Sequence, residues 1–179
     1  MKEDIFYYVY GILHSPKHRT AFSDDLKKAL PRIPLVEKSD DFWAFSRAGR
    51  ELARLHLEYE SIAPLEGVTV SGDRSNCRVA KMRFKAKGEK DTIIFNQYIT
   101  VSNIPAKAYK YVVNGKAAIE WVMERYQVKT DKDSGIVNDP NLYADETGQP
   151  EYILDLLLSV IAVSVQTIDI VEELPDIAW

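Results

Sequence analysis

The feature that most constrains the fold is an apolar run near the C-terminus, YILDLLLSVIAVSVQTIDIV, from Tyr152 to Val171. A stretch this apolar must be shielded from water, either in a protein core or in a membrane. Asp155, Gln166 and Asp169 interrupt the run, and such polar side chains are costly inside a membrane. The run therefore predicts a buried helix that follows Pro150 and ends near Glu173, and no membrane span.

The length and composition predict one globular domain that covers residues 1–179. The chain has 179 residues, of which 46% are apolar, which is enough for one sizeable core. Its single cysteine, Cys77, cannot form an internal disulfide, and no secretory leader opens the sequence. We therefore expect a cytoplasmic protein.

The N-terminal part, residues 1–60, is predicted to be mainly helical. A first helix is expected from Asp4 to Ser15, and a second helical stretch after Pro16, with Ser23 or Asp24 as its cap and Pro31 as its end. Residues 31–35 should be extended, and a long amphipathic helix should begin at Ser39. The core-facing residues of that helix are expected to be Phe42, Phe45, Leu52 and either Leu55 or Leu57.

The central part, residues 61–101, is predicted to be rich in strands. GVTVSG, RVAKMRFKAK and TIIFNQYITV alternate or run apolar, and a turn at Gly88–Asp91 joins the last two as an antiparallel hairpin. Residues 102–179 should again be mainly helical, with Asn114-Gly115 ending one helix and a loop at residues 127–141. The order predicts an α+β fold, with helices around a small antiparallel sheet or hairpin.

The stretch VAKMRFKAK, residues 79–87, has a distinctive alternation. Side chains of a strand point to opposite faces in turn, so Lys81, Arg83, Lys85 and Lys87 would share one face. Met82, Phe84 and Ala86 would line the other face. The cationic face is either a phosphate-binding surface or the solvated side of a half-buried strand, and the pattern favours neither.

The overall charge of −4 conceals an asymmetry along the chain. Residues 1–132 contain all 23 Lys and Arg against 17 Asp and Glu, whereas residues 133–179 contain 10 acids and no Lys or Arg. A net acidic protein is a poor non-specific binder of nucleic acid, yet a local basic face remains compatible with DNA binding.

Motifs of autonomous enzymes are missing from the sequence: it has no phosphate-binding GxxxxGK[ST] loop, no GxGxxG, no GxSxG and no HExxH. Ser15-Pro16 separates His14 from His18, which argues against a metal pair. Asp131, Asp133 and Asp139 could bind Mg²⁺ in a nuclease, but Asp residues equally stabilise turns. We predict turns there, and no metal site.

Four ordered segments resemble a known family: YVYGILHSPKHR, ALPRIPL, FWAFSRAGRELARLHL and YKYVVNGKAAIEWVMERYQVKTDKDSGIVNDPN. Together they resemble the C-terminal specificity (target-recognition) region of Type ISP restriction-modification enzymes, long single-chain proteins often labelled predicted helicases. Within the first two segments, YVYGILHSP and PRIPL also occur more widely in related single-chain restriction-modification and methyltransferase polypeptides. The resemblance extends from about Asp4 to Pro175.

The resemblance implies a DNA target-recognition domain, non-catalytic by itself, that positions double-stranded DNA for an adjoining adenine methyltransferase. Nuclease, helicase-like ATPase and methyltransferase modules would belong to the same polypeptide and use S-adenosylmethionine, ATP and Mg²⁺, whereas this domain would need no cofactor. The chain would then be an excised domain or a stand-alone remnant. The alternative is a protein-interaction module that docks a helicase or methyltransferase domain through the acidic C-terminal helix.

If the chain recognises DNA, the region of the hairpin is the expected surface. Lys and Arg contact phosphates, while Arg, Asn and Gln contact base edges in the major groove. The candidate DNA-binding residues are Arg74, Asn76, Arg78, Lys81, Arg83, Lys85, Lys87, Asn96 and Gln97.

Overall fold

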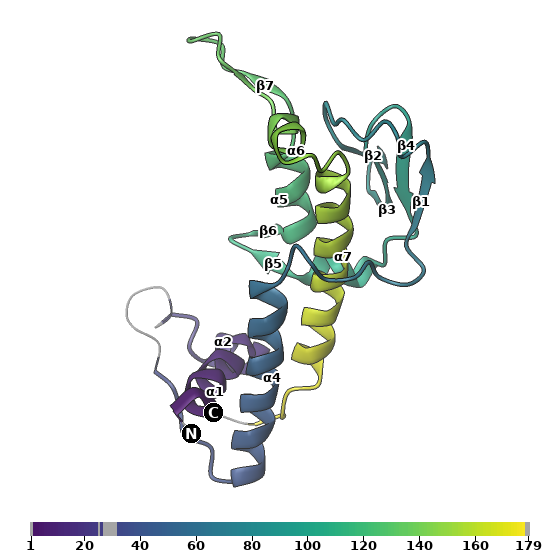
Figure 1. Cartoon of the computed structure of the whole chain (residues 1–179). Helices are drawn as coiled ribbons and strands as arrows, with labels where there is room; N and C mark the ends of the chain where they lie inside the picture. Colours follow the sequence, from purple (N-terminus) through teal and green to yellow (C-terminus); the bar gives the residue numbers. More distant parts are fainter. Residues whose placement is uncertain (1, 25, 27–31, 178–179) are drawn as a thin grey trace. The chain divides into compact units, whose positions relative to one another are not determined.

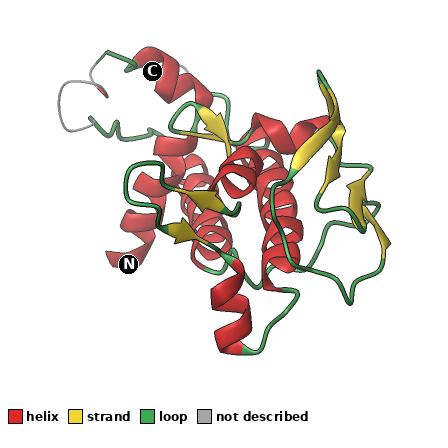
Figure 2. Ribbon diagram, turned by 90° about the horizontal axis from the view of Figure 1, so that it is seen from above, coloured by secondary structure: helices red, strands yellow, loops and turns green. Residues whose placement is uncertain are grey.

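The computed structural model describes residues 2–24, 26 and 32–177. The chain divides into two compact units: unit 1 comprises Met1–Glu58 and Gln166–Trp179, and unit 2 comprises Tyr59–Val165 (Figure 1). Helices and small antiparallel sheets supply the regular structure (Figure 2), which confirms the α+β class. That residues 1–179 form a single domain stays a prediction.

Unit 1 is helical and contains α1 (Lys2–His14), α2 (Pro16–Ala21) and α4 (Ser39–Leu57). Helix α1 packs against α4 through glycine: a Cβ atom on Gly49 would overlap the carbonyl oxygen of Tyr7 and lie 2.8 Å from the Gly11 nitrogen. The absence of side chains at this contact lets the two backbones approach closely. The buried residues of its core are Tyr8, Ile12 and Phe45.

A network of polar side chains in unit 1 links α1 and α4 to Thr167. The Tyr10 hydroxyl is hydrogen-bonded to Nδ1 of His56 at 2.7 Å, and Nε2 of His56 is hydrogen-bonded to Oγ1 of Thr167 at 3.1 Å. Burial, together with the nearby His14, lowers the pKa of His56 to about 4. His56 is therefore held neutral inside the fold at physiological pH.

Unit 2 contains a four-stranded antiparallel sheet in the order β1-β4-β3-β2. Its strands are β1 (Thr69–Gly72), β2 (Arg83–Ala86), β3 (Glu89–Ile94) and β4 (Ile99–Ser102). Strand β2 lies at an edge of the sheet and pairs with β3, with Arg83 opposite Ile94 and Phe84 opposite Ile93. The register shifts between Phe84 and Ala86: only Lys85 separates these two residues, whereas three residues of β3 separate their partners Ile93 and Glu89.

Helices and two short hairpins complete unit 2. The helices are the 3-10 helix η1 (Ala106–Lys110), α5 (Ala118–Arg125) and α6 (Asn141–Thr147). One hairpin joins β5 (Val112–Val113) to β6 (Lys116–Ala117), and the other joins β7 (Lys129–Thr130) to β8 (Val137–Asn138). The core of the unit joins inward residues of the sheet, such as Ile93 and Val101, to the apolar face of α5 and to α7 (Tyr152–Glu172).

Helix α7 (Tyr152–Glu172) confirms the buried helix predicted from the apolar run. Within the described ranges, it is the one helix long and apolar enough to cross a membrane. Of an 18-residue apolar stretch of this helix, 72% is buried inside the protein. Leu154, Leu157 and Ile161 are completely inaccessible to solvent. The helix is therefore accounted for as a core element.

The other predicted helices agree with the structure in part. Phe45, Leu52 and Leu55 of α4 are buried, whereas Leu57 is 82% exposed, so Leu55 is the core residue of that pair. The second helical stretch appears in part as α2, and the predicted cap residues Ser23 and Asp24 lie in a turn after it. The continuation from there to Pro31 falls mostly outside the described residues.

Two predictions for residues 105–141 are wrong. Asn114 and Gly115 do not end a helix: both have positive φ, 50° and 81°, and form the turn of the β5–β6 hairpin. Left-handed residues suit a helix end and a two-residue hairpin turn equally, so this dipeptide could not distinguish them. The predicted loop at 127–141 contains the β7–β8 hairpin.

Candidate functional site

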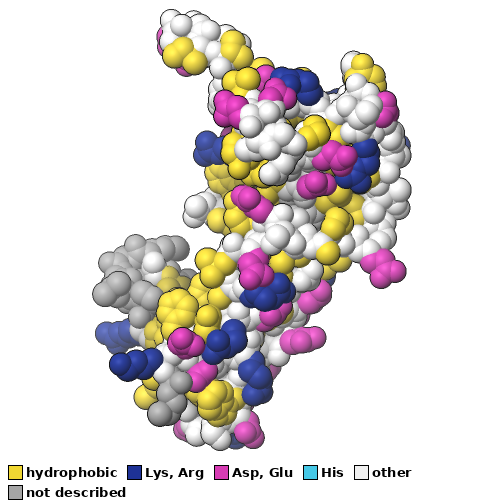
Figure 3. Space-filling model, viewed as in Figure 1, with side chains coloured by type: hydrophobic (Ala, Val, Ile, Leu, Met, Phe, Trp, Pro, Cys, Tyr) yellow, Lys and Arg dark blue, Asp and Glu magenta, His cyan; other side chains and the backbone are white. Residues whose placement is uncertain are grey.

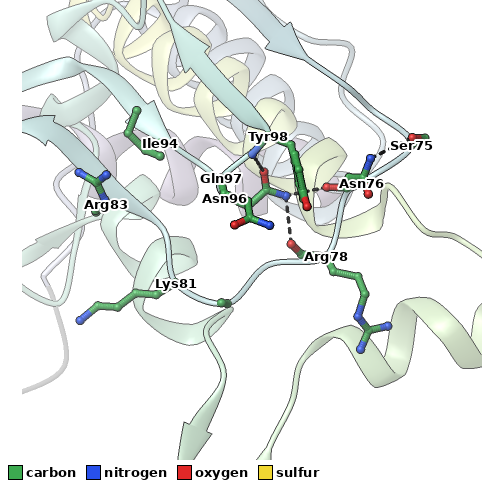
Figure 4. Close-up of a pocket in the computed structure, with 10 residues that line it drawn as sticks. Ser75, Asn76, Arg78, Lys81, Arg83, Ile94, Asn96, Gln97 and Tyr98 are labelled. Carbon is green, nitrogen blue, oxygen red and sulfur yellow. Dashed lines mark hydrogen bonds between the residues drawn. The ribbon is translucent and has the colours of Figure 1, made fainter.

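A pocket of about 610 Å³ in unit 2 lies beside the start of β2 and the bend between β3 and β4 (Figure 4). Its lining brings together six of the nine predicted DNA-binding residues, Asn76, Arg78, Lys81, Arg83, Asn96 and Gln97. The remaining lining residues are Ser75, Ala80, Ile94 and Tyr98. The predicted residues, which are up to 21 positions apart in sequence, thus form one surface.

Asn96 holds the bend in place. Its Oδ1 accepts hydrogen bonds from the backbone N–H groups of Tyr98 and Ile99, both at 2.8 Å. Its Nδ2 donates to the carbonyl oxygens of Asn76 at 2.7 Å and Arg78 at 3.0 Å. An amide can make about four such bonds, so the side chain of Asn96 is fully used within the protein and leaves no group for a base edge.

Residues 73–79 form an arm that is fixed along its length. The Asp73 carboxylate accepts bonds from the Ser75 backbone N–H and hydroxyl and from the Asn76 amide, which lowers the pKa of Asp73. At the other end, the buried Asn141 side chain accepts from the Val79 N–H at 2.9 Å and donates to its carbonyl at 2.8 Å. The backbone that lines the pocket is therefore rigidly supported.

Two of the predicted cations, Arg74 and Arg78, are already paired with acids. Arg74 contacts Glu151 and, at 3.3 Å, Asp155, and Arg78 contacts Asp145 at 2.6 Å and Asp139 at 3.3 Å. These carboxylates raise the pKa values of both guanidinium groups. On the face shown in Figure 3, basic and acidic side chains likewise lie next to one another in several places.

The other four cations are different. Among the described residues, no carboxylate forms an ion pair with Lys81, Arg83, Lys85 or Lys87, and all four are exposed. They follow one another along the edge strand β2 and its flanks. Arg83 and Lys81 also line the pocket. Their positive charges are therefore available to an anionic partner.

The alternating strand is shorter than the sequence predicts. Regular pairing covers Arg83–Ala86, so Lys81 precedes the strand, and Lys87 lies with Gly88 in the two-residue turn that replaces the predicted turn at Gly88–Asp91. Met82 is buried and Phe84 is half-buried, as predicted, but Ala86 is exposed. Ala86 pairs with Glu89 directly at the turn, at the end of the hairpin.

The prediction that Asn96 and Gln97 lie on a strand is wrong. TIIFNQYITV contains parts of two strands, β3 and β4, and these two residues lie in the bend between them. The adjacent polar pair Asn-Gln within an apolar run is the signal that could have revealed this bend. Sequence reasoning also missed Tyr98, which lines the pocket and is 51% exposed.

The acidic loop uses its carboxylates in turns. Oδ1 of Asp131 accepts from the backbone N–H groups of Asp133 and Ser134 at 3.1 and 2.8 Å, and Asp139 accepts from the Asn141 N–H at 2.9 Å. These bonds lower the pKa values of Asp131 and Asp139. Within residues 2–24, 26 and 32–177, no three His, Cys, Asp or Glu side chains are grouped so that they could hold a metal ion.

Comparison with known proteins gives concordant matches. A family model for the Type ISP C-terminal specificity domain matches residues 1–156. A nuclease-deletion mutant of the Type ISP restriction-modification enzyme LlaGI, solved in complex with a DNA substrate mimic, is 51% identical over 97% of this chain, with a TM-score of 0.90. The ATP-dependent Type ISP enzyme LlaBIII bound to DNA is 49% identical over 99% of this chain, with a TM-score of 0.91.

A more distant match is the DrdV–DNA complex, which is 33% identical over 98% of this chain, with a TM-score of 0.80. The chain spans only 14%, 11% and 18% of the LlaGI, LlaBIII and DrdV chains, respectively. Comparison with curated protein sequences found no match.

Proposed function

Since the chain belongs to the Type ISP C-terminal specificity domain family, we propose that it recognises the target sequence of double-stranded DNA for a longer restriction-modification polypeptide. The three similar structures are DNA complexes, which supports DNA as the partner. Because the chain spans a small part of each of those proteins, DNA recognition is its proposed share of a larger activity.

The observation that carries this proposal is the row of unpaired cations at β2 beside the pocket. Lys81, Arg83, Lys85 and Lys87 are free of carboxylate partners among the described residues, whereas Arg74 and Arg78 are neutralised. Lys and Arg bound to phosphates supply affinity and orientation, and polar side chains in the major groove supply the sequence readout. The pocket places both kinds of group side by side.

The domain itself is proposed to be non-catalytic. Methyltransferase, helicase-like ATPase and nuclease modules of the same polypeptide would bind S-adenosylmethionine, ATP and Mg²⁺, and the site described above would need none of them. Its task would be to position DNA so that the methyltransferase reaches a target adenine. The cytoplasm, where DNA and these cofactors occur together, is the proposed location.

Two structural observations bear on the competing explanations. Docking through α7 has little surface to use, because most of that helix is buried, and Asp155 of the helix and Glu151 just before it contact Arg74. The cations of β2 could instead serve only to prevent edge-to-edge association of the sheet, a common use of lysine on edge strands. DNA-binding measurements distinguish that role from recognition.

The test is charge reversal with a matched control. The double variant Arg83→Glu, Lys85→Glu is compared with Lys38→Glu, Arg47→Glu, which makes the same change of net charge at exposed positions of unit 1. Loss of two phosphate contacts should reduce the slope of log affinity against log salt by about 2. We expect this loss only in the β2 variant, with both variants folded. Equal effects of the two variants would contradict the proposal.

A further inference from the structure

One polar side chain of the pocket has no assigned role in the fold. Asn96 uses its whole amide, the Asn76 amide nitrogen donates to Asp73 and Ser75, and Arg78 is paired with two carboxylates. Gln97 is exposed and forms no hydrogen bond with any other described residue. Its amide therefore remains open for a ligand.

Hydrogen bonds fix the backbone on both sides of Gln97. On one side Phe95 and Asn96 donate backbone N–H bonds to the Ile99 carbonyl at 3.0 and 3.3 Å. On the other side the Asn96 side chain bonds the next two N–H groups and also ties the bend to the arm at Asn76 and Arg78. Figure 4 shows the bonds of the Asn96 side chain to Asn76, Arg78 and Tyr98. An exposed side chain on a rigid support is the arrangement that specific recognition requires.

The neighbours of Gln97 fit a base pair as its ligand. Lys81 and Arg83 line the same pocket and carry free positive charge suited to a phosphate backbone. Tyr98 adds a half-exposed aromatic ring that can contact an apolar group such as the methyl of thymine. A glutamine amide matches the donor and acceptor of adenine at N6 and N7 in the major groove.

We propose that Gln97 reads an A·T base pair of the target through the major-groove edge of adenine, and that Asn96 is the residue that positions it. This inference rests on the proposed function, because it assigns a role within DNA recognition. Lys81 and Arg83 then supply affinity without base preference, so that affinity and specificity belong to different residues of one pocket.

The experiment selects bound duplexes from a random pool, using the complete polypeptide that carries this chain, and sequences them. The wild-type protein should enrich a motif that includes an A·T pair whose preference depends on Gln97. In Gln97→Ala, discrimination at that one position should fall by roughly 5- to 150-fold, with the other positions and the salt slope unchanged. In Gln97→Arg, the preference should move to G·C, because arginine matches guanine at O6 and N7.

Asn96→Asp tests the positioning role. The carboxylate keeps the two acceptor bonds to Tyr98 and Ile99 but cannot donate to the carbonyls of Asn76 and Arg78. The Asn96→Asp variant should lose base preference at the same position of the DNA target as Gln97→Ala. If Asn96 served only the fold, the substitution would instead lower affinity for all targets alike. Thermal melting of each variant checks that it is folded.

The possible failures are distinguishable. If the wild-type polypeptide enriches a motif and Gln97→Ala leaves every position unchanged, the assignment of Gln97 is wrong while DNA recognition stands. A G·C pair at the position that depends on Gln97 would also overturn it. If the wild-type polypeptide enriches no motif, both the proposed function and this inference fail.

Discussion

All three histidines of the chain lie in unit 1, and all nine residues predicted to bind DNA lie in unit 2. In unit 1 a histidine is bonded inside the fold: His56 is hydrogen-bonded to Tyr10 and Thr167 and held neutral. In unit 2 the cations Lys81, Arg83, Lys85 and Lys87 are exposed. The stability of unit 1 should therefore depend on its packing and on pH, whereas DNA binding by unit 2 should depend on salt concentration.

The largest effect is expected at the glycine contact of unit 1. Alanine at Gly49 would overlap the Tyr7 carbonyl, and both partners there are helix backbones that cannot move aside cheaply. We expect Gly49→Ala to lower the free energy of unfolding by about 4 kcal/mol, measured by urea denaturation. Gly67→Ala in unit 2 is the control: it has open space and only a strained φ of 90°, so about 1 kcal/mol should be lost. Similar losses in both variants would contradict close packing of α1 on α4.

A smaller loss of unfolding free energy is expected at Asn141, a buried polar residue of unit 2. Asn141 is 4% exposed, and its amide satisfies both backbone groups of Val79. Asn141→Ala leaves these groups without partners and should cost about 2–3 kcal/mol in urea denaturation. Asn138→Ala, at an exposed position of β8, should cost less than about 0.5 kcal/mol. An unchanged stability of Asn141→Ala would show that the arm is not held from α6.

The pH dependence of stability should come from unit 1. The folded-state pKa of His56, about 4, lies below its ordinary value of 6.5, so the unfolded chain takes up the proton first as pH falls. The stabilisation is complete above about pH 6.5 and is lost as pH falls toward 4, by about 1–2 kcal/mol after allowance for solvent screening. Denaturation curves at pH 7 and pH 5 measure this loss.

His56→Gln is the matched variant for the pH measurement. Glutamine can still bond to Tyr10 and Thr167 but does not titrate. His14, whose pKa burial also lowers, contributes in the same direction, so a reduced slope should remain in the variant. A slope identical to that of the wild type would place the pH sensitivity elsewhere.

The smallest effect concerns the last cation of the row. Lys87 lies in the turn after β2, outside the pocket, so it can contribute at most one peripheral phosphate contact. Lys87→Ala should reduce the salt slope of DNA binding by no more than about 1, and Arg83→Ala should reduce it at least as much. A larger effect at Lys87 than at Arg83 would place the DNA along the turn instead of the pocket.

The amphipathic and apolar patterns of the sequence predicted the helices well. The apolar run predicted α7, and the spacing of Phe45, Leu52 and Leu55 predicted the buried face of α4. Such patterns are reliable because burial of a helix face depends on many side chains at once. Asn114-Gly115 was misassigned because its left-handed backbone serves two different structures.

The candidate site was predictable as a set of residues but not in its division of roles. Alternation in VAKMRFKAK indicated a basic face, and that face exists at Lys81, Arg83 and Lys85. The sequence could not show that carboxylates neutralise Arg74 and Arg78, because these carboxylates lie 61 to 81 positions away along the chain. The saturation of Asn96 likewise depends on backbone groups of a distant segment.

The central claim is that this chain recognises a DNA sequence, and one measurement tests it most directly. The protein is titrated at low salt against a pool of random duplexes, and the bound fraction is sequenced. Enrichment of one short motif is the predicted result, because the pocket combines free cations with a base-reading amide. Binding without enrichment, or no binding at all, would contradict the account.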